Sequence, residues 1–166
     1  MPFSSFTLSS QIQQSLQKND YNKPTQIQEK VIPLVLEHKD IMARAQTGSG
    51  KTASFVLPIL QLLSNDIKDG KAKIKVLVLT PTRELTLQVA NSFDTFSEFL
   101  PKKPIVVSVI GGEHIGEQLL SVQKGCDIVV ATSGRLLDII NKKQINLSFL
   151  DFFILDEADK MLDILG

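Results

Sequence analysis

Residues 45–52, with the sequence AQTGSGKT, have the composition of a phosphate-binding loop. They follow a short β-branched run at residues 41–43 and precede an apolar, helix-like pattern at residues 53–63. The glycines let successive N–H groups face phosphate oxygens, while Lys51 supplies charge near the β- and γ-phosphates and Thr52 supplies a hydroxyl for Mg²⁺. The predicted contacts are Gln46, Thr47, Gly48, Ser49, Gly50, Lys51 and Thr52. Ala45 stands where the general pattern has its first glycine, and the alternative is a glycine-rich turn with a chance lysine.

A second chemical pattern is the acidic run DEAD at residues 156–159, directly after the apolar residues 152–155. At the end of a strand, Asp156 could hold Mg²⁺ through its water shell, and Glu157 could orient or deprotonate an attacking water. Lys51, Asp156 and Glu157 are therefore the predicted catalytic residues, and Thr52 and Asp156 are the predicted metal ligands. The alternative is an acidic turn that caps the next helix.

Five β-branched runs alternate with helical patterns, which predicts an α/β fold with a parallel sheet flanked by helices. The predicted strands are residues 41–43, 76–79, 105–110, 128–131 and 152–155, and the predicted helices between them are residues 53–63, 84–99, 115–123 and 136–141. Two further helical stretches, residues 10–18 and 25–36, precede the sheet, and residues 65–75 read as a polar loop. Ligands of such sheets bind beyond the carboxyl ends of the strands.

Composition limits the alternatives. The chain has 166 residues with 18 basic and 18 acidic side chains, so no overall positive field draws it to nucleic acid, and any such contact must be local. A single cysteine, Cys126, excludes an internal disulfide and favours a reducing compartment. No apolar run approaches the length that spans a bilayer, so we expect a cytoplasmic location and no membrane partner. His38 and His114 lack metal-ligand spacing and are predicted to be surface residues.

Together these patterns resemble the DEAD-box family of ATP-dependent RNA helicases over almost the whole chain. The acidic run spells the family name, the phosphate loop looks like the family's loop, and four other family sequences occur in order: PTQIQ at residues 24–28, PTREL at 81–85, GG at 111–112 and TSGR at 132–135. The resemblance implies a RecA-like phosphate-loop domain that uses ATP and Mg²⁺, with residues 1–36 recognising adenine and residues 37–166 forming the core.

The resemblance assigns adenine recognition to Gln28, whose carboxamide can donate to and accept from the adenine edge. Spacing alone favours another role, because Thr25 and Gln28 also form a capping box. Phe3 occupies the place of the family's upstream aromatic, a platform near the adenine, and because Phe6 is close in sequence, core packing of either ring is the alternative. Asp20 replaces a glycine of the family pattern.

The resemblance assigns three strand ends to single-stranded RNA, which would be bound through its backbone and therefore without sequence preference. The residues carried over are Pro81, Thr82, Arg83, Gly111, Gly112, Thr132, Gly134 and Arg135. Ser133 departs from the family's proline. Read without the family, each of these segments is an ordinary strand-to-helix turn.

Family members carry two RecA-like domains, whereas this sequence stops before the family's Ser-Ala-Thr segment and before the second domain. We expect the chain alone to hydrolyse ATP hardly at all, because a missing arginine finger costs about 10³ to 10⁵ in rate. We also expect a gap in the sheet that makes the isolated chain unstable or prone to borrow a strand. The alternatives are a non-catalytic module that binds nucleotide or RNA and a different phosphate-loop ATPase, such as a DNA translocase.

Overall fold

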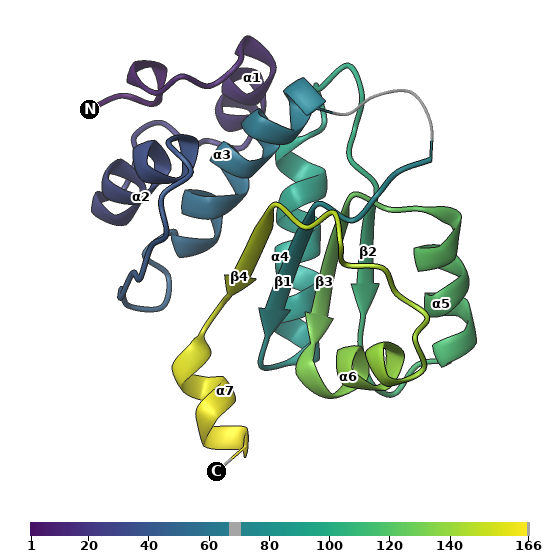
Figure 1. Ribbon diagram of the computed structural model, residues 1–166. Helices are drawn as coiled ribbons and strands as arrows, with labels where there is room; N and C mark the ends of the chain where they lie inside the picture. Colours follow the sequence, from purple (N-terminus) through teal and green to yellow (C-terminus); the bar gives the residue numbers. More distant parts are fainter. Residues whose placement is uncertain (67–70, 166) are drawn as a thin grey trace. The chain divides into compact units, whose positions relative to one another are not determined.

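The computed structural model describes residues 1–66 and 71–165, so part of the loop predicted at 65–75 lies outside the described residues (Figure 1). The helices are η1 (Phe3–Ser5, a 3-10 helix), α1 (Ser10–Lys18), α2 (Gln26–Leu36), α3 (Lys51–Asp66), α4 (Arg83–Phe96), α5 (Ile115–Lys124), α6 (Ser133–Asn141) and α7 (Ala158–Leu165). The strands are β1 (Val76–Thr80), β2 (Val106–Val109), β3 (Ile128–Thr132) and β4 (Phe152–Leu155).

The strands form one parallel sheet in the order β2-β3-β1-β4. β1 pairs with β3 and with β4, so that Val76 lies opposite both Ile128 and Phe152. The predicted α/β architecture and four of the five predicted strands are therefore confirmed. The fifth prediction, a strand at residues 41–43, is wrong: these residues have no regular secondary structure. A β-branched run becomes a strand only where a neighbour satisfies its backbone groups, and none of the described residues does so here.

The chain divides into two compact units, and each is described by itself. Unit 1 contains residues 1–67 and 92–103, and unit 2 contains residues 68–91 and 104–166. The phosphate loop belongs to unit 1, whereas the sheet and all four strand ends belong to unit 2. The predicted subdivision at residue 36 stays a prediction.

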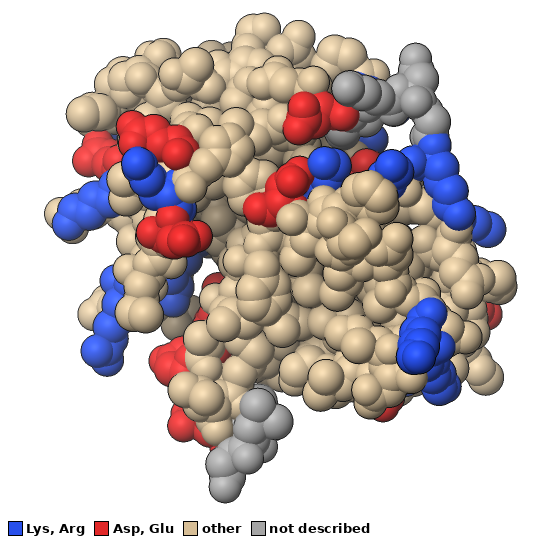
Figure 2. Space-filling view, in the orientation of Figure 1, with Lys and Arg blue, Asp and Glu red and all other residues tan. Residues whose placement is uncertain are grey.

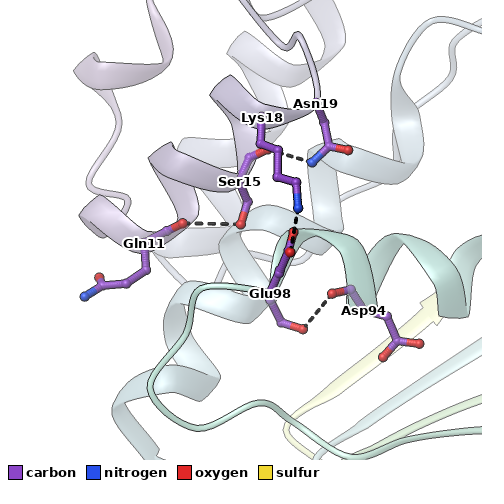
Figure 3. Close-up of polar contacts among 7 residues, drawn as sticks. Gln11, Ser15, Lys18, Asn19, Asp94 and Glu98 are labelled. Carbon is purple, nitrogen blue, oxygen red and sulfur yellow. Dashed lines mark hydrogen bonds and ion pairs between the residues drawn. The ribbon is translucent and has the colours of Figure 1, made fainter.

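In unit 1, α2 and α3 pack against each other, and α1 is tied to the residues that end and follow α4. The Nζ of Lys18 lies 2.6 Å from the Oε1 of Glu98 (Figure 3). Ser9 caps α1 through its side chain, which accepts from the N–H of Ile12, and the Asn19 side chain donates to the carbonyl of Ser15 at 2.8 Å. These contacts hold the loop that follows α1, residues 19–23. This loop lines the same cavity as Gly48 and Gly50 of the phosphate loop.

In unit 2, one face of the sheet is covered by α5 and α6. Leu77 and Val129 of the sheet pack in one apolar cluster with Leu119 of α5 and Ile139 of α6. This face runs on to β4, where Phe153 pairs with Leu77 in register and is 55% exposed. Burial on this face therefore decreases toward β4.

No helix in the described part of the chain is long and apolar enough to cross a membrane.

Burial predicts unequal sensitivity along this sheet face. Leu77 is 4% exposed and Leu155 is 51% exposed, and both side chains lie on the same face. We expect Leu77→Ala to lower the free energy of unfolding by about 2–4 kcal/mol, because it removes buried methyl groups and leaves a cavity. Leu155→Ala, the matched control, should cost less than about 1 kcal/mol. Urea unfolding followed by circular dichroism measures both, and equal losses would contradict the assigned burial.

Candidate functional site

The phosphate loop turns sharply just before α3. Gly48 and Gly50 have φ values of +80° and +84°, which side-chain-bearing residues rarely adopt. Lys51 is the first residue of α3, and its Nζ donates to the carbonyl of Ala45 at 2.8 Å. The Oγ of Ser49 is buried and has no hydrogen-bond partner among the described residues. A glycine turn that leads into a helix N-terminus, with an ammonium beside it, suits an anionic group.

Gln28 joins α2 to the phosphate loop. The residue is 1% exposed, its Oε1 accepts from the N–H of Thr25 at 2.9 Å, and its Nε2 donates to the carbonyl of Gly50 at 3.1 Å. The capping box that the spacing favours is therefore present. The same amide also holds the loop, a contact that the sequence did not reveal. Contact between Gln28 and adenine stays a prediction.

A cavity of about 360 Å³ lies beside these residues in unit 1. It is lined by the loop after α1, by Gln28 and by Gly48 and Gly50. Tyr21, which is 37% exposed, contributes an aromatic ring to the lining that the sequence analysis missed. Its position could have been suspected only from the adjacent PTQIQ sequence. Asp20, which replaces the family's glycine, has a φ of +59° and so takes the left-handed conformation itself.

Phe3 lies in an aromatic cluster. It is 4% exposed and packs edge-on against Phe6, with ring centroids 6.2 Å apart. Its ring also lies 6.4 Å from Tyr21, which stacks edge-on against Phe96 at 5.1 Å. The core-packing alternative is therefore observed for Phe3, and its contact with adenine stays a prediction.

In unit 2, the carboxyl end of β1 is tied to α4 by hydroxyl groups. The side chains of Thr80 and Thr86 share a buried hydrogen bond of 2.6 Å, and Thr86 also donates to the carbonyl of Thr82 at 3.0 Å. The hydroxyl of Thr82 accepts from the N–H of Leu85 at 3.2 Å. These bonds fix the turn at Pro81, Thr82 and Arg83 and leave Thr82 and Arg83 exposed.

Glu113 links two of the predicted RNA-binding segments. Its carboxylate lies 3.8 Å from the Nη2 of Arg83, and its carbonyl accepts from the Nη1 of Arg135 at 3.0 Å. Gln118 completes the network, because it accepts from Arg135 at 3.3 Å and donates to Glu113 at 3.1 Å. Gly112 has a φ of +79°, which side-chain-bearing residues rarely adopt, and this explains the glycine there. Sequence reasoning missed Glu113 and Gln118, and only the place of Glu113 after the glycine pair hinted at its position.

The structure thus brings the strand-end segments to one edge of the sheet, as parallel pairing requires. The remaining predicted RNA-binding residues lie at this edge: Pro81, Gly111 and Thr132 partly buried, and Gly134 exposed.

Asp156 and Glu157 follow β4 at the same edge. Asp156 is 7% exposed, and its N–H donates to the carbonyl of Leu79 at 2.9 Å. Glu157 has a φ of +53°, an uncommon conformation for a residue with a side chain. Its Oε2 lies 2.9 Å from the Nζ of Lys160, and this hydrogen bond and charge raise the pKa of Lys160. Glu157 also lies directly before α7, and its carbonyl accepts from the N–H of Met161 at 3.3 Å. Its positive φ differs from the extended backbone of an N-cap residue, so the capping alternative stays a prediction.

The predicted metal ligands Thr52 and Asp156 lie in different units, and their joint contact with Mg²⁺ stays a prediction. In the described part of the chain, no group of three or more His, Cys, Asp and Glu side chains could hold a metal ion. His38 and His114 are both exposed, as predicted.

Known proteins are similar to this chain in sequence and in fold. The sequence model of the DEAD/DEAH box helicase family matches residues 25–165. An ATP-dependent RNA helicase DeaD of Buchnera aphidicola is 46% identical over 165 residues, which cover 98% of this chain and 26% of that protein. A probable ATP-dependent RNA helicase of Methanocaldococcus jannaschii is 42% identical, with coverage of 99% and 43%. The chain therefore spans between about a quarter and two fifths of the length of these curated relatives.

Solved structures of related proteins have a similar fold. The crystal structure of a DEAD box protein from the hyperthermophile Methanococcus jannaschii superposes with a TM-score of 0.89 at 41% identity, and covers 99% of this chain and 43% of that one. A hypothetical ATP-dependent RNA helicase from Sulfolobus tokodaii gives a TM-score of 0.82 at 40% identity, with coverage of 95% and 44%. The predicted RecA-like fold is confirmed.

Two glycine substitutions separate backbone strain from the Gln28 contact. Alanine at Gly48 or Gly50 meets the same positive φ, which costs about 1–2 kcal/mol. Only at Gly50 would the added Cβ strike the Nε2 of Gln28, whereas no atom lies within 4 Å at Gly48. We expect Gly50→Ala to be about 1 kcal/mol less stable than Gly48→Ala, because the bond between Gln28 and Gly50 is lost. Thermal unfolding measures the difference, and identical stabilities would contradict that hydrogen bond.

Proposed function

Because the chain belongs to the DEAD/DEAH box helicase family, we propose that it is the N-terminal, ATP-binding domain of an ATP-dependent RNA helicase. The observation that carries the proposal is the hydrogen bond from Gln28 to Gly50, at the edge of a cavity. It joins a side chain that can read a base edge to the loop that suits phosphates. The relatives' names, ATP-dependent RNA helicases, support the same activity.

The residues of the phosphate loop fit a nucleotide. The buried Oγ of Ser49, which has no partner within the described residues, can bond to a phosphate oxygen. The ammonium of Lys51 has three N–H donors, and one of them bonds to the carbonyl of Ala45. The Thr52 hydroxyl and the Asp156 carboxylate are the hard oxygen donors that Mg²⁺ prefers. Bound there, Mg²⁺ would neutralise charge on the phosphate oxygens. In this proposal Lys51 binds phosphate, and Gln28 distinguishes adenine from guanine.

Glu157 is proposed to orient and deprotonate the attacking water. Its carboxylate is paired with Lys160, an exposed partner, so the pair is weak enough to be exchanged for a water. The left-handed backbone of Glu157 also fits a functional site, where such conformations concentrate. Asp156, nearly buried at the end of β4, is held by its own backbone bond to Leu79.

The strand-end segments are proposed to bind the sugar-phosphate backbone of single-stranded RNA without reading its sequence. Arg83 supports this role, because its side chain is 49% exposed and its distance of 3.8 Å to Glu113 is long for an ion pair. A phosphate can therefore replace Glu113 as its partner. Hydrolysis and separation of short duplexes would need the second RecA-like domain to close over both ligands.

Nucleotide selectivity tests the role of Gln28. We expect MgADP to bind at least about tenfold more tightly than MgGDP, and Gln28→Ala to reduce the preference to below about threefold, because guanine leaves the amide mismatched. Isothermal titration calorimetry measures both affinities. Thr25→Ala is the matched control, since it perturbs the same capping box but keeps the Gln28 side chain. Equal affinities of the unaltered chain for the two nucleotides would contradict the proposal.

RNA affinity tests the strand-end turns. We expect Arg83→Ala to weaken binding of a single-stranded oligonucleotide uniformly across sequences and to lower the slope of log affinity against log salt by about 1, because one phosphate contact is lost. Lys124→Ala removes the same charge at the far end of α5 and should leave both quantities unchanged. Fluorescence anisotropy over a range of salt concentrations measures the slope. A strong sequence preference, or an equal effect of the two variants, would argue against this interface.

A further inference from the structure

Unit 2 has a cavity of about 530 Å³ that the proposed function does not use. Its lining comes from the residues that lead into β1, from the end of α5 and the turn before β3, and from the segment after α6. In Figure 1 these parts meet beside the amino ends of β1 and β3. The volume lies within the range of small-molecule sites, about 300–1,000 Å³.

The rim of this cavity is basic. Lys71, Lys73 and Lys143 line it, and no Asp or Glu does so among the described residues. Figure 2 shows basic side chains over the stretch that leads from the grey segment into β1. Two acids that are close to the lining in sequence have partners: Asp127 accepts from the N–H of Ile105 at 2.7 Å, and Asp151 pairs with Lys75 at 2.9 Å. Although the chain has no net charge, this surface suits an anion.

The inner lining is apolar and carries one exposed aromatic ring. Ile74, Val122 and Cys126 are buried there, and burial together with Asp127 raises the pKa of the Cys126 thiol to about 12. Phe149 keeps 40% of its surface exposed, and the Nζ of Lys73 lies 4.0 Å from its ring centroid. A flat ring beside ammonium groups is the combination that binds bases and phosphates together.

One side chain of the lining lacks a partner. The Oε1 of Gln144 is buried and makes no hydrogen bond within the described residues. The position of Gln144 is fixed, because Lys143 has a left-handed φ of +53° and the N–H of Gln144 donates to the carbonyl of Ile139 at 3.3 Å. A buried acceptor without a partner is costly, and a donor that a ligand brings would satisfy it.

We propose that this cavity binds one nucleotide: its phosphate on Lys71, Lys73 and Lys143, its base against Phe149, and an N–H of the base on the Oε1 of Gln144. The shared chemistry is a phosphate linked to a flat nitrogenous ring, which either a free mononucleotide or one residue of single-stranded RNA supplies. The site lies at the amino ends of the strands, whereas the strand-end turns lie at the carboxyl ends, about 15 Å away along a five-residue strand. One nucleotide does not reach both.

Nuclear magnetic resonance of the 166-residue chain tests the proposal with AMP as the probe. The titration uses Lys51→Ala, which weakens the phosphate loop, and follows the backbone amides of residues 72–75, 122–126 and 143–149. We expect saturable shifts at these amides. The readout is local to unit 2, so it does not depend on whether the phosphate loop binds ATP.

Substitutions of the lining residues test each proposed contact with AMP. Phe149→Ala should weaken AMP binding about tenfold, because a stacking surface is lost. Gln144→Ala and the triple variant K71A/K73A/K143A should each weaken it as well, whereas Lys142→Ala, the exposed neighbour that does not line the cavity, should change it less than about twofold. Protection of Cys126 from a thiol reagent at pH 8 checks that each variant is folded, because the thiol is buried and protonated.

Further titrations identify the source of the bound nucleotide and can contradict the proposal. A ten-residue oligoadenylate that shifts the same amides and binds more tightly than AMP, with a strong salt dependence, identifies RNA as the source; AMP binding at least as tightly identifies a free nucleotide. Inorganic phosphate that matches AMP in shifts and affinity, with Phe149→Ala without effect, would overturn the nucleotide in favour of a simple anion. Shifts with an acidic peptide but not with AMP, or no shifts at millimolar AMP, would also overturn it.

Discussion

Parallel pairing of β1 with both β3 and β4 is the constraint on which unit 2 depends. Because the strands run in one direction, every connection that leaves the sheet begins at the same edge, and the polar residues that follow each strand meet there. The buried bond between Thr80 and Thr86 then sets the angle at which α4 departs. Glu113 and Gln118 hold Arg135 after β3 by hydrogen bonds, and the carboxylate of Glu113 forms a longer ion pair of 3.8 Å with Arg83 after β1. Arg83 and Arg135 thus both contact Glu113, the first through its carboxylate and the second through its carbonyl.

In unit 1 the arrangement of the candidate site depends on one carboxamide, the side chain of Gln28. Gln28 uses its oxygen to close the first turn of α2 and its nitrogen to hold the carbonyl of Gly50, so helix capping and loop position depend on the same side chain. Capping by Gln28 is observed, whereas its contact with a base stays a prediction. A residue that is already engaged at both ends is pre-organised, which lowers the entropy lost when a ligand binds nearby.

The sequence predicted the parts of the fold that local pattern determines. Continuous apolar runs predicted β1 to β4, and the glycine spacing predicted the turn that precedes α3, whereas phosphate binding by that turn stays a prediction. The strand prediction at residues 41–43 is wrong because a strand needs a neighbouring strand, which the periodicity of the sequence does not reveal. Tyr21, Glu113 and Gln118 were missed since their roles come from contacts between segments far apart in sequence. Gln28 was assigned two competing roles because spacing does not show that α2 lies against Gly50. The cytoplasmic location and the stability expected of the isolated chain stay predictions.

The alternating exposure along β4 has a further consequence. Phe152 and Ile154 are half-buried while Phe153 and Leu155 are exposed, so the two faces of this strand differ although all four residues are apolar. Within the described residues β4 is the last strand of the sheet order, and any polypeptide that extends the sheet beyond it would have to match that alternation. A shift of one residue would turn its side chains to the opposite face. The strand therefore discriminates between registers, and this limits which segments can extend the sheet productively and which would form mismatched, aggregation-prone pairings.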